Sequence, residues 1–164
     1  MEIIKLQKND IKNALNLVWT VFQEFEAPDY SKQGIEEFRK FISYNHNIEK
    51  FDKGELYFWG CVDNDDLVGV LSTRGINHIC MLFVNKEYHR RGIARSLFQI
   101  VEEKCKSQNN ISKITLNSSP YAISIYHHLG FFDTDKELTM NGIRYTPMSY
   151  LINSTSATNH IMLL

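Results

Sequence analysis

The sequence predicts an α/β (α+β) fold in which a mixed, mostly antiparallel seven-stranded sheet carries helices on both faces. Three observations support this. Short runs rich in β-branched and aromatic residues alternate with segments whose apolar residues recur at helical spacing. Turn-forming residues separate two pairs of these runs, as in antiparallel hairpins. One run, residues 78–84, is almost continuously apolar, which is typical of a central strand covered on both sides.

The first third of the chain is predicted to form a strand followed by two helices. Residues 3–6 suggest a short strand, and Asn9 or Asp10 can cap a helix that ends near Pro28. Ser31 can cap a second helix. Both helices would be amphipathic because apolar residues recur at helical spacing, namely Ile11, Leu15, Trp19 and Phe22 in the first and Ile35, Phe38, Phe41 and Ile42 in the second.

The rest of the chain is mostly β in pattern, with two further helices. One follows a polar loop after residue 84 and carries an apolar stripe up to Cys105. The other begins near Pro120 and ends at Gly130, a residue typical of helix ends. The expected strands are residues 56–62, 67–73, 78–84, 111–116, 131–138 and 144–152, with turns at Asp63–Asp66 and Asn141–Gly142.

Length and charge limit the classes of protein that fit. A chain of 164 residues with 43% hydrophobic composition is enough for one compact domain, expected over residues 1–152, with a C-terminal tail at residues 153–164. The 18 Lys and Arg against 19 Asp and Glu give no electrostatic footprint for nucleic acid or an anionic membrane. With no signal peptide or spanning segment expected, we expect a cytoplasmic protein. The tail and the final hairpin are candidates for a homodimer contact.

The most informative segment is ICMLFVNKEYHRRGIARSLF, residues 79–98, in which an apolar strand runs into a basic loop that opens a helix. The first turn of a helix leaves backbone N–H groups unpaired and adds partial positive charge, which suits a pyrophosphate. Gly92 and Ala94 are small enough for phosphate oxygens to approach, and Arg90, Arg91 and Arg95 add charge. Taken alone, the pattern is better explained by ordinary turn chemistry and a solvated basic face.

A second segment, LNSSPYAISIYHHLGFF at residues 116–132, follows after one strand and one helix. Together the two segments resemble the GCN5-related N-acetyltransferase (GNAT) family. The family motif Gln/Arg-x-x-Gly-x-Gly/Ala corresponds to residues 89–94, with His89 as a departure. The strand ending in Asn, the helix with Ala and Tyr, and the closing Gly-Phe correspond to Asn117, Ala122, Tyr126, Gly130 and Phe131.

The resemblance implies an acyl-CoA N-acyltransferase fold with acetyl-CoA as co-substrate, bound where the fourth and fifth strands splay apart. The pantetheine arm would pair with Leu82, Phe83 and Val84 like an added strand, and Asn117 would reach it from the other side. The pyrophosphate would lie on the amides of a continuous run, Arg90, Arg91, Gly92, Ile93, Ala94 and Arg95. The implied reaction transfers the acetyl group directly to the amine of a small molecule or peptide.

Such a reaction needs a base for the amine and an acid for the departing thiolate. The resemblance implies that Tyr126 is the acid, although a Tyr on an apolar helix is also a common core residue. His78 has an ordinary pKa suited to a base and could also contact the acceptor, or it is simply the polar end of a strand. Glu24, Glu26 and Asp29 could bind a cationic acceptor or relay its proton, or they are surface charges.

Other chemistries are weaker alternatives. Adjacent His127 and His128 point about 100° apart on a helix and lack a third ligand, so we expect no metal. Covalent catalysis by Cys80 would need a base, and only His78 lies near it in the sequence. A different class, a non-catalytic acyl-CoA-binding or interaction module, would keep the cofactor cleft without the acceptor chemistry. A nucleotide-binding oxidoreductase would need G-x-G-x-x-G after its first strand, and that pattern is absent.

Overall fold

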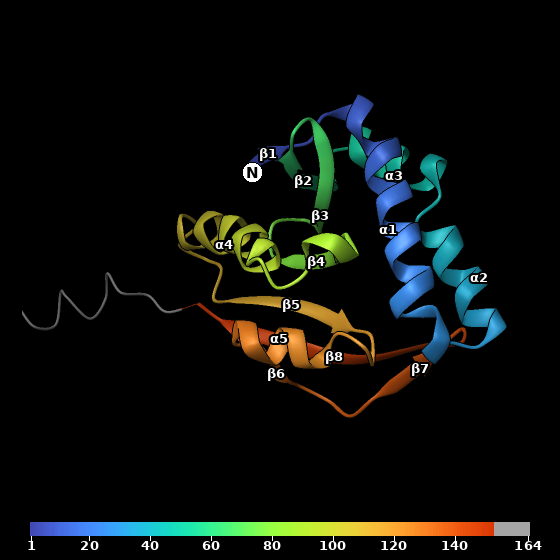
Figure 1. Cartoon of the computed structure of the whole chain (residues 1–164). Helices are drawn as coiled ribbons and strands as arrows, with labels where there is room; N and C mark the ends of the chain where they lie inside the picture. The colour runs from blue at the N-terminus through green and yellow to red at the C-terminus, as the bar shows by residue number, and fades with distance from the viewer. Residues whose placement is uncertain (153–164) are drawn as a thin grey trace, which may run out of the picture.

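In the computed structural model, residues 1–152 are described, and they alternate between helices and strands (Figure 1). Short 3₁₀ turns lie at Lys8–Asp10, Ala27–Asp29 and Lys86–Tyr88. The expected tail at residues 153–164 lies outside the described part. The helices are α1 (Ile11–Phe25), α2 (Lys32–Phe41), α3 (Tyr44–Asp52), α4 (Ile93–Lys106) and α5 (Ile123–Leu129), and the strands are β1 (Glu2–Lys5), β2 (Leu56–Asp63), β3 (Asp66–Arg74), β4 (His78–Val84), β5 (Lys113–Ser118), β6 (Phe132–Asp133), β7 (Leu138–Met140) and β8 (Ile143–Leu151).

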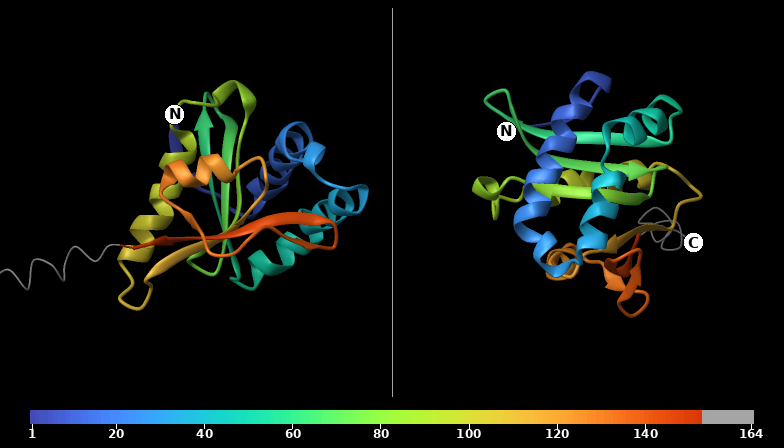
Figure 2. Two further views of the ribbon diagram at one scale, coloured as in Figure 1. Left: turned by 90° about the horizontal axis from the view of Figure 1, so that it is seen from below. Right: turned by 90° about the vertical axis from the view of Figure 1, so that its right-hand side faces the viewer.

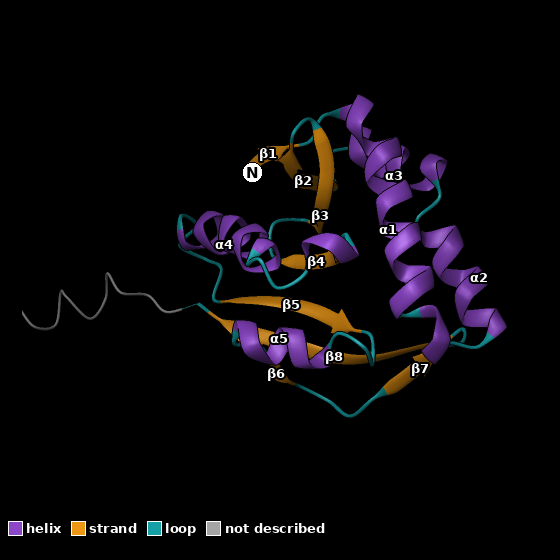
Figure 3. Cartoon of the chain, in the orientation of Figure 1, coloured by secondary structure: helices purple, strands orange, loops and turns teal. Residues whose placement is uncertain are grey.

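The strands form one sheet in the order β1-β2-β3-β4-β5-β8-β6, with β7 also paired to β8. Only the contact between β4 and β5 is parallel. This confirms the mixed, mostly antiparallel sheet. The expected number of seven strands is wrong, because residues 1–152 alone contribute eight strands to the sheet. The run expected at residues 131–138 is broken into β6 and β7 by a loop (Figure 3), in which Asp135 accepts a hydrogen bond from the Lys136 amide and bends the chain.

One helix was not expected from the sequence. Residues 44–52 form α3, capped by the Ser43 hydroxyl, which accepts a hydrogen bond from the His46 amide at 3.4 Å. The equivalent cap expected at Ser31 is present on α2, where its hydroxyl accepts from the Gly34 amide at 3.1 Å. Few apolar residues lie in the 44–52 segment, so periodicity alone gives a weak helical signal there.

Helices cover both faces of the sheet, as expected. On one face α1 and α2 pack over β3 and β4 around Phe22, Phe38 and Phe58, and the right-hand view of Figure 2 shows both helices lying across the strands. On the other face α4 and α5 enclose a second core that includes Leu97 and Phe131. The two cores keep the central strands buried on both sides, which explains the continuous apolar run of β4. No described helix combines the length and apolarity needed to cross a lipid bilayer.

The middle of β4 is irregular. Ser72 of β3 pairs with Met81, but Thr73 pairs with Ile79, so Cys80 is an extra residue in β4 and forms a β-bulge. The parallel pairing with β5 stops at the same point, because its last partners are Ile79 and Leu116. Beyond the bulge, the main chain of β4 therefore has no strand partner on the β5 side, and the sheet opens.

Candidate active site

Two adjoining pockets open where β4 and β5 separate. The large pocket has a volume of about 900 Å³ and lies against the loop between β4 and α4. The small pocket has a volume of about 360 Å³ and lies between α2, β4, β5 and the β7–β8 hairpin. The two share five lining residues, Glu26, Leu82, Phe83, Ala122 and Tyr126.

The loop at the large pocket exposes main-chain groups. Gly92 has a φ of +78° and immediately precedes α4, and Arg90 has a φ of +63°. This left-handed backbone is easy for glycine and costly for residues with a side chain. A Cβ added at Gly92 would meet no atom within 4 Å. The loop therefore leaves open space in front of the first amides of α4, which fits a diphosphate at the positive end of the helix dipole.

Side chains around this loop divide into two groups. Arg90, Gly92, Ile93, Ala94 and Arg95 line the large pocket, as do Leu82 to Val84 of β4. Arg91 does not line it, because its guanidinium lies over the Tyr88 ring at 4.9 Å from the centroid.

His89 is the position that departs from the family motif. Its Nε2 lies 2.7 Å from the Val84 carbonyl oxygen, so the imidazole ties the loop to the end of β4. The His89 side chain is thus engaged within the protein.

The junction of the two pockets holds one carboxyl group and one phenol. Tyr126 of α5 is buried, and its burial, together with the nearby Glu26 carboxyl, raises the pKa of its hydroxyl. Glu26, just after α1, is half-buried; this burial raises the pKa of its carboxyl to about 7, Asp29 adds to the rise, and the Ser119 hydroxyl opposes it. At neutral pH the phenol is therefore protonated and the carboxyl is close to half ionised.

The other acidic residues named from the sequence lie elsewhere. Glu24 is exposed and forms an ion pair with Lys86 at 2.9 Å. Asp29 is exposed, and neither residue lines either pocket. Of the three, only Glu26 faces the junction, because the chain turns into the 3₁₀ segment Ala27–Asp29 directly after it.

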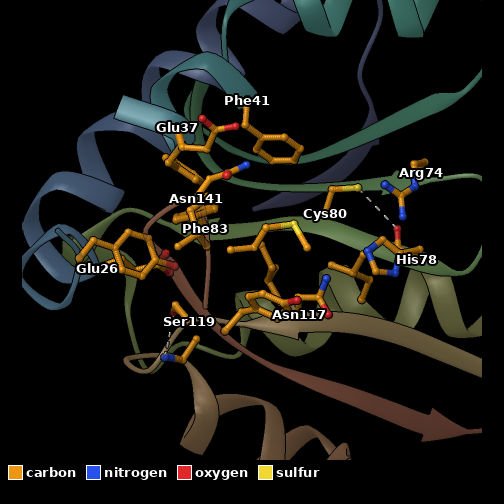
Figure 4. A pocket seen from close by; sticks show the side chains of 18 of the residues that line it. Glu26, Glu37, Phe41, Arg74, His78, Cys80, Phe83, Asn117, Ser119 and Asn141 are labelled. Atoms are coloured by element: carbon orange, nitrogen blue, oxygen red, sulfur yellow. Dashed lines mark hydrogen bonds between the residues drawn. The ribbon is translucent and has the colours of Figure 1, made fainter. Parts of the chain in front are cut away.

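His78 lines the small pocket but lies away from the junction. Figure 4 shows it beside Arg74, on the opposite side of the pocket from Glu26. Its Nδ1 is 2.8 Å from the Thr115 hydroxyl, and burial, with the nearby Arg74 charge, lowers its pKa. Three residues lie between His78 and Leu82 at the junction, which corresponds to at most about 13 Å of strand, because the bulge at Cys80 shortens the stretch.

Two more predicted residues also line the small pocket. Asn117 of β5 faces it and does not line the large one. Cys80 is partly buried in its wall, and burial raises the pKa of the thiol, which keeps it in the less nucleophilic protonated form. All three cysteines are free, and Cys61 and Cys105 are buried in the core.

Sequence reasoning missed most of the small pocket. Glu37 of α2, Arg74 of β3 and Tyr145 of β8 lie on elements that are far apart in the sequence, and none belongs to a motif. The only available signal was Ser119, which lies inside the second motif and whose hydroxyl accepts a hydrogen bond from the Ala122 amide at 3.3 Å.

Comparisons with known proteins identify relatives of the chain. A model of the acetyltransferase (GNAT) domain matches residues 26–152. The UPF0157 protein YqkA of Bacillus subtilis is 34% identical over 77 residues, and this match spans 45% of our chain and 22% of that protein's length.

Solved structures share the fold at low sequence identity. The PaiA N-acetyltransferase of Thermoplasma acidophilum, solved in complex with coenzyme A, has a TM-score of 0.74 at 20% identity, covering 92% of this chain and 98% of that one. A spermidine N-acetyltransferase of Vibrio cholerae, solved with CoA and spermine, has a TM-score of 0.60 at 20% identity, covering 92% and 95%. With a family match over more than half of its residues, the chain belongs to the GNAT family of acetyltransferases, enzymes that use acetyl-CoA as acyl donor.

Proposed function

We propose that the protein transfers the acetyl group of acetyl-CoA directly to an amine of a small molecule or short peptide. The observation that carries this proposal is the junction of the two pockets, where Glu26 and Tyr126 line both. This arrangement supports the proposal that a base and an acid act between a pocket suited to the coenzyme and a pocket of acceptor size. The large pocket would hold the donor, and the small pocket the amine.

Glu26 is proposed as the general base. An alkylamine has an ordinary pKa near 10.4, so it arrives mostly as an ammonium ion and must lose a proton to react. A carboxylate with a pKa of about 7 can accept that proton at neutral pH, as the nitrogen forms its bond to the acetyl carbon and becomes more acidic. We assign this role to Glu26 in preference to His78, which lies toward the other end of the small pocket.

Tyr126 is proposed as the general acid. When the carbon–sulfur bond breaks, the sulfur leaves as a thiolate that needs a proton. The Tyr126 hydroxyl is buried and its raised pKa keeps it protonated until that moment. Edge-to-face packing against Phe131, with ring centroids 5.7 Å apart, holds the phenol in place.

Main-chain groups complete the proposed site. The bulge at Cys80 and the end of β4–β5 pairing leave the following β4 amides without a strand partner on the β5 side. Such amides can pair with the pantetheine arm or stabilise the oxyanion that forms when the amine adds to the thioester. The amides of residues 90–95 are proposed to hold the pyrophosphate, with Arg90 and Arg95 adding positive charge.

The test is Tyr126→Phe, which removes one oxygen atom. We expect kcat to fall by about 100-fold over a panel of amines, because general acid catalysis is lost. The Kd for acetyl-CoA, measured by calorimetry, should stay within about twofold, since the phenol acts on the leaving thiolate rather than on binding of the donor.

Tyr121→Phe is the matched control, because Tyr121 lines only the large pocket. It should leave kcat unchanged. Acetyl-CoA binding without turnover of any amine by the unmodified protein would contradict the proposal and favour a non-catalytic acyl-CoA-binding module.

A further inference from the structure

The small pocket carries opposite charges at its two ends. Glu26 and Glu37 lie on one side of it, and Arg74 lies on the other with the His78 imidazole beside it, as the close view shows (Figure 4). The imidazole is uncharged at neutral pH because burial and the Arg74 charge lower its pKa. Aromatic side chains line the wall between them, among them Phe41 and Phe83. A pocket built in this way favours an acceptor with a cation at one end, an anion at the other and an apolar middle.

The basic end is formed by two neighbouring strands. Arg74 ends β3 and is the direct register partner of His78, the first residue of β4. Directly opposed residues in an antiparallel pair lie on the same face with their side chains adjacent. When the Thr115 hydroxyl donates to Nδ1 of His78, the other ring nitrogen carries the proton and can donate to an anion.

Arg74 also lacks a charge partner in the described part of the chain. Across residues 1–152, no carboxylate lies within ion-pair distance of its guanidinium. Burial raises the pKa of the nearby Cys80 thiol, and the charges of Arg74 and Lys50 oppose that rise. A guanidinium lining a pocket without a carboxylate is suited to bind one from a ligand.

The acidic end is where the reactive amine would lie. Glu26 is at the junction, and Glu37 of α2, half-buried, has no cationic partner among residues 1–152 either. The two ends are separated by at most about 13 Å along β4, from His78 to Leu82, because the bulge at Cys80 shortens this stretch. Side chains reach into this space from both ends, so the charged groups of a ligand would be about 10 Å apart, the length of an extended tripeptide.

We propose that the acceptor is an amine that carries a carboxylate about 10 Å from its reactive nitrogen, as in a short peptide or a long-chain ω-amino acid. The amine lies against Glu26 and Glu37, and the carboxylate pairs with Arg74 and His78. This inference rests on the proposed function and specifies its substrate. A polyamine would place a second ammonium group against Arg74, where like charges repel.

The test compares acceptors that differ only in the distal charge. Trialanine is paired with trialanine amide, and 8-aminooctanoate with octylamine; spermidine represents polyamines. We expect each carboxylate to have at least a tenfold higher kcat/KM than its neutral partner, the size expected for one charge-assisted hydrogen bond. Whichever of trialanine and 8-aminooctanoate has the higher kcat/KM identifies the source of the carboxylate as a peptide or an ω-amino acid.

Arg74→Gln should remove this preference. The KM for the carboxylate acceptors should rise about tenfold with kcat within twofold, while the neutral acceptors should be unaffected. Arg74→Lys should restore part of the preference because it keeps the charge. Arg39→Gln is the matched control, since Arg39 lies over the Trp19 ring at 5.3 Å and outside the small pocket.

Binding gives a second measurement that does not need turnover. In the presence of CoA, trialanine should bind to the protein with higher affinity in calorimetry than trialanine amide, and Arg74→Gln should remove the difference. Equal binding of the two peptides, or a preference for spermidine, would overturn the inference. If trialanine binds with this preference but no amine is acetylated, the proposed function fails while the charge assignment of the pocket stands.

Discussion

The two pockets of the site are built in different ways. One wall of the large pocket is a single continuous segment, residues 84–95, and presents main-chain amides at the start of α4. The small pocket is built from side chains on elements scattered along the chain, including α2, β3, β4, β5 and the β7–β8 hairpin. A pocket that presents the backbone tolerates changes of side chain, such as His89 at a position where the family motif has Gln or Arg. A pocket that presents side chains changes its specificity with each substitution.

The hairpin of β7 and β8 forms part of the small pocket because it is fixed to the start of α2. The Ser31 hydroxyl lies 3.5 Å from the Gly142 carbonyl oxygen, and Arg144 donates to the Asp29 carbonyl oxygen at 3.1 Å. These contacts join residues more than a hundred positions apart. Asn141 and Tyr145, which lie on either side of these contacts in the sequence, line the small pocket.

The largest expected effect is that of Glu26→Gln, which removes a group shared by the two pockets. At pH 7.5, kcat/KM should fall by about 10²- to 10³-fold, because a proposed general base is lost. In the unmodified protein kcat/KM should rise with pH through about 7, since the base acts only when ionised and burial raises the pKa of Glu26 to that value. The variant should lose this rise.

A pH series of initial rates with one amine measures both effects. Glu24→Gln serves as the control, because Glu24 is exposed and paired with Lys86 outside both pockets. If Glu26→Gln kept the pH dependence near 7, the base would be another group, and His78 would be the next to test.

A smaller effect, confined to the large pocket, is expected for Gly92→Ala. The added methyl group would occupy the space proposed for the pyrophosphate, and the φ of +78° disfavours alanine. We expect the Kd for acetyl-CoA to rise about tenfold, which is 1.4 kcal/mol. The KM for the amine should change little.

Gly54→Ala separates backbone strain from the loss of space. Gly54 has a φ of +74° and, like Gly92, no neighbour within 4 Å of an added Cβ, but it does not line either pocket. Both variants should lose similar stability in thermal unfolding. An equal loss of acetyl-CoA affinity in both would show that strain alone explains the effect and that Gly92 does not face the ligand.

The same contrast explains what could be predicted from the sequence. The helices and strands followed from periodicity, and the pyrophosphate site before α4 was predicted from contiguous residues, 89–94, that resemble the motif of the GNAT family. Arg74 and Glu37 could not be found in this way, because their role arises from tertiary packing and neither belongs to a local pattern. Glu24, Glu26 and Asp29 carry the same charge and lie close together in the sequence, so the sequence does not distinguish them. Only the turn after α1 places Glu26 at the junction.

Where local patterns were weak, predictions of the secondary structure were also wrong. The segment of residues 44–52 buries little apolar surface, so α3 gave no clear stripe. The break between β6 and β7 depends on a bend at Asp135, whose side chain bonds to the next amide, and residues on both sides still have strand character. Both features lie outside the loop between β4 and α4, where the motif residues are contiguous in the sequence.

The smallest expected effect on activity, Gly34→Ala, tests whether the hairpin is truly a wall of the acceptor pocket. An added Cβ at Gly34 would lie 2.2 Å from the Gly142 carbonyl oxygen, so the hairpin must move. We expect the KM for the amine to rise about fivefold and stability to fall by about 1–3 kcal/mol, as for other overpacked sites. The Kd for acetyl-CoA should not change, because Gly34 lies far from the loop before α4 in the chain and outside the large pocket.

Gln33→Ala, at the exposed neighbouring position of α2, is the control and should change neither the KM for the amine nor the stability. A loss of stability with an unchanged KM would mean that the hairpin supports the fold without shaping the acceptor pocket, and the specificity would then rest on β3, β4 and α2 alone.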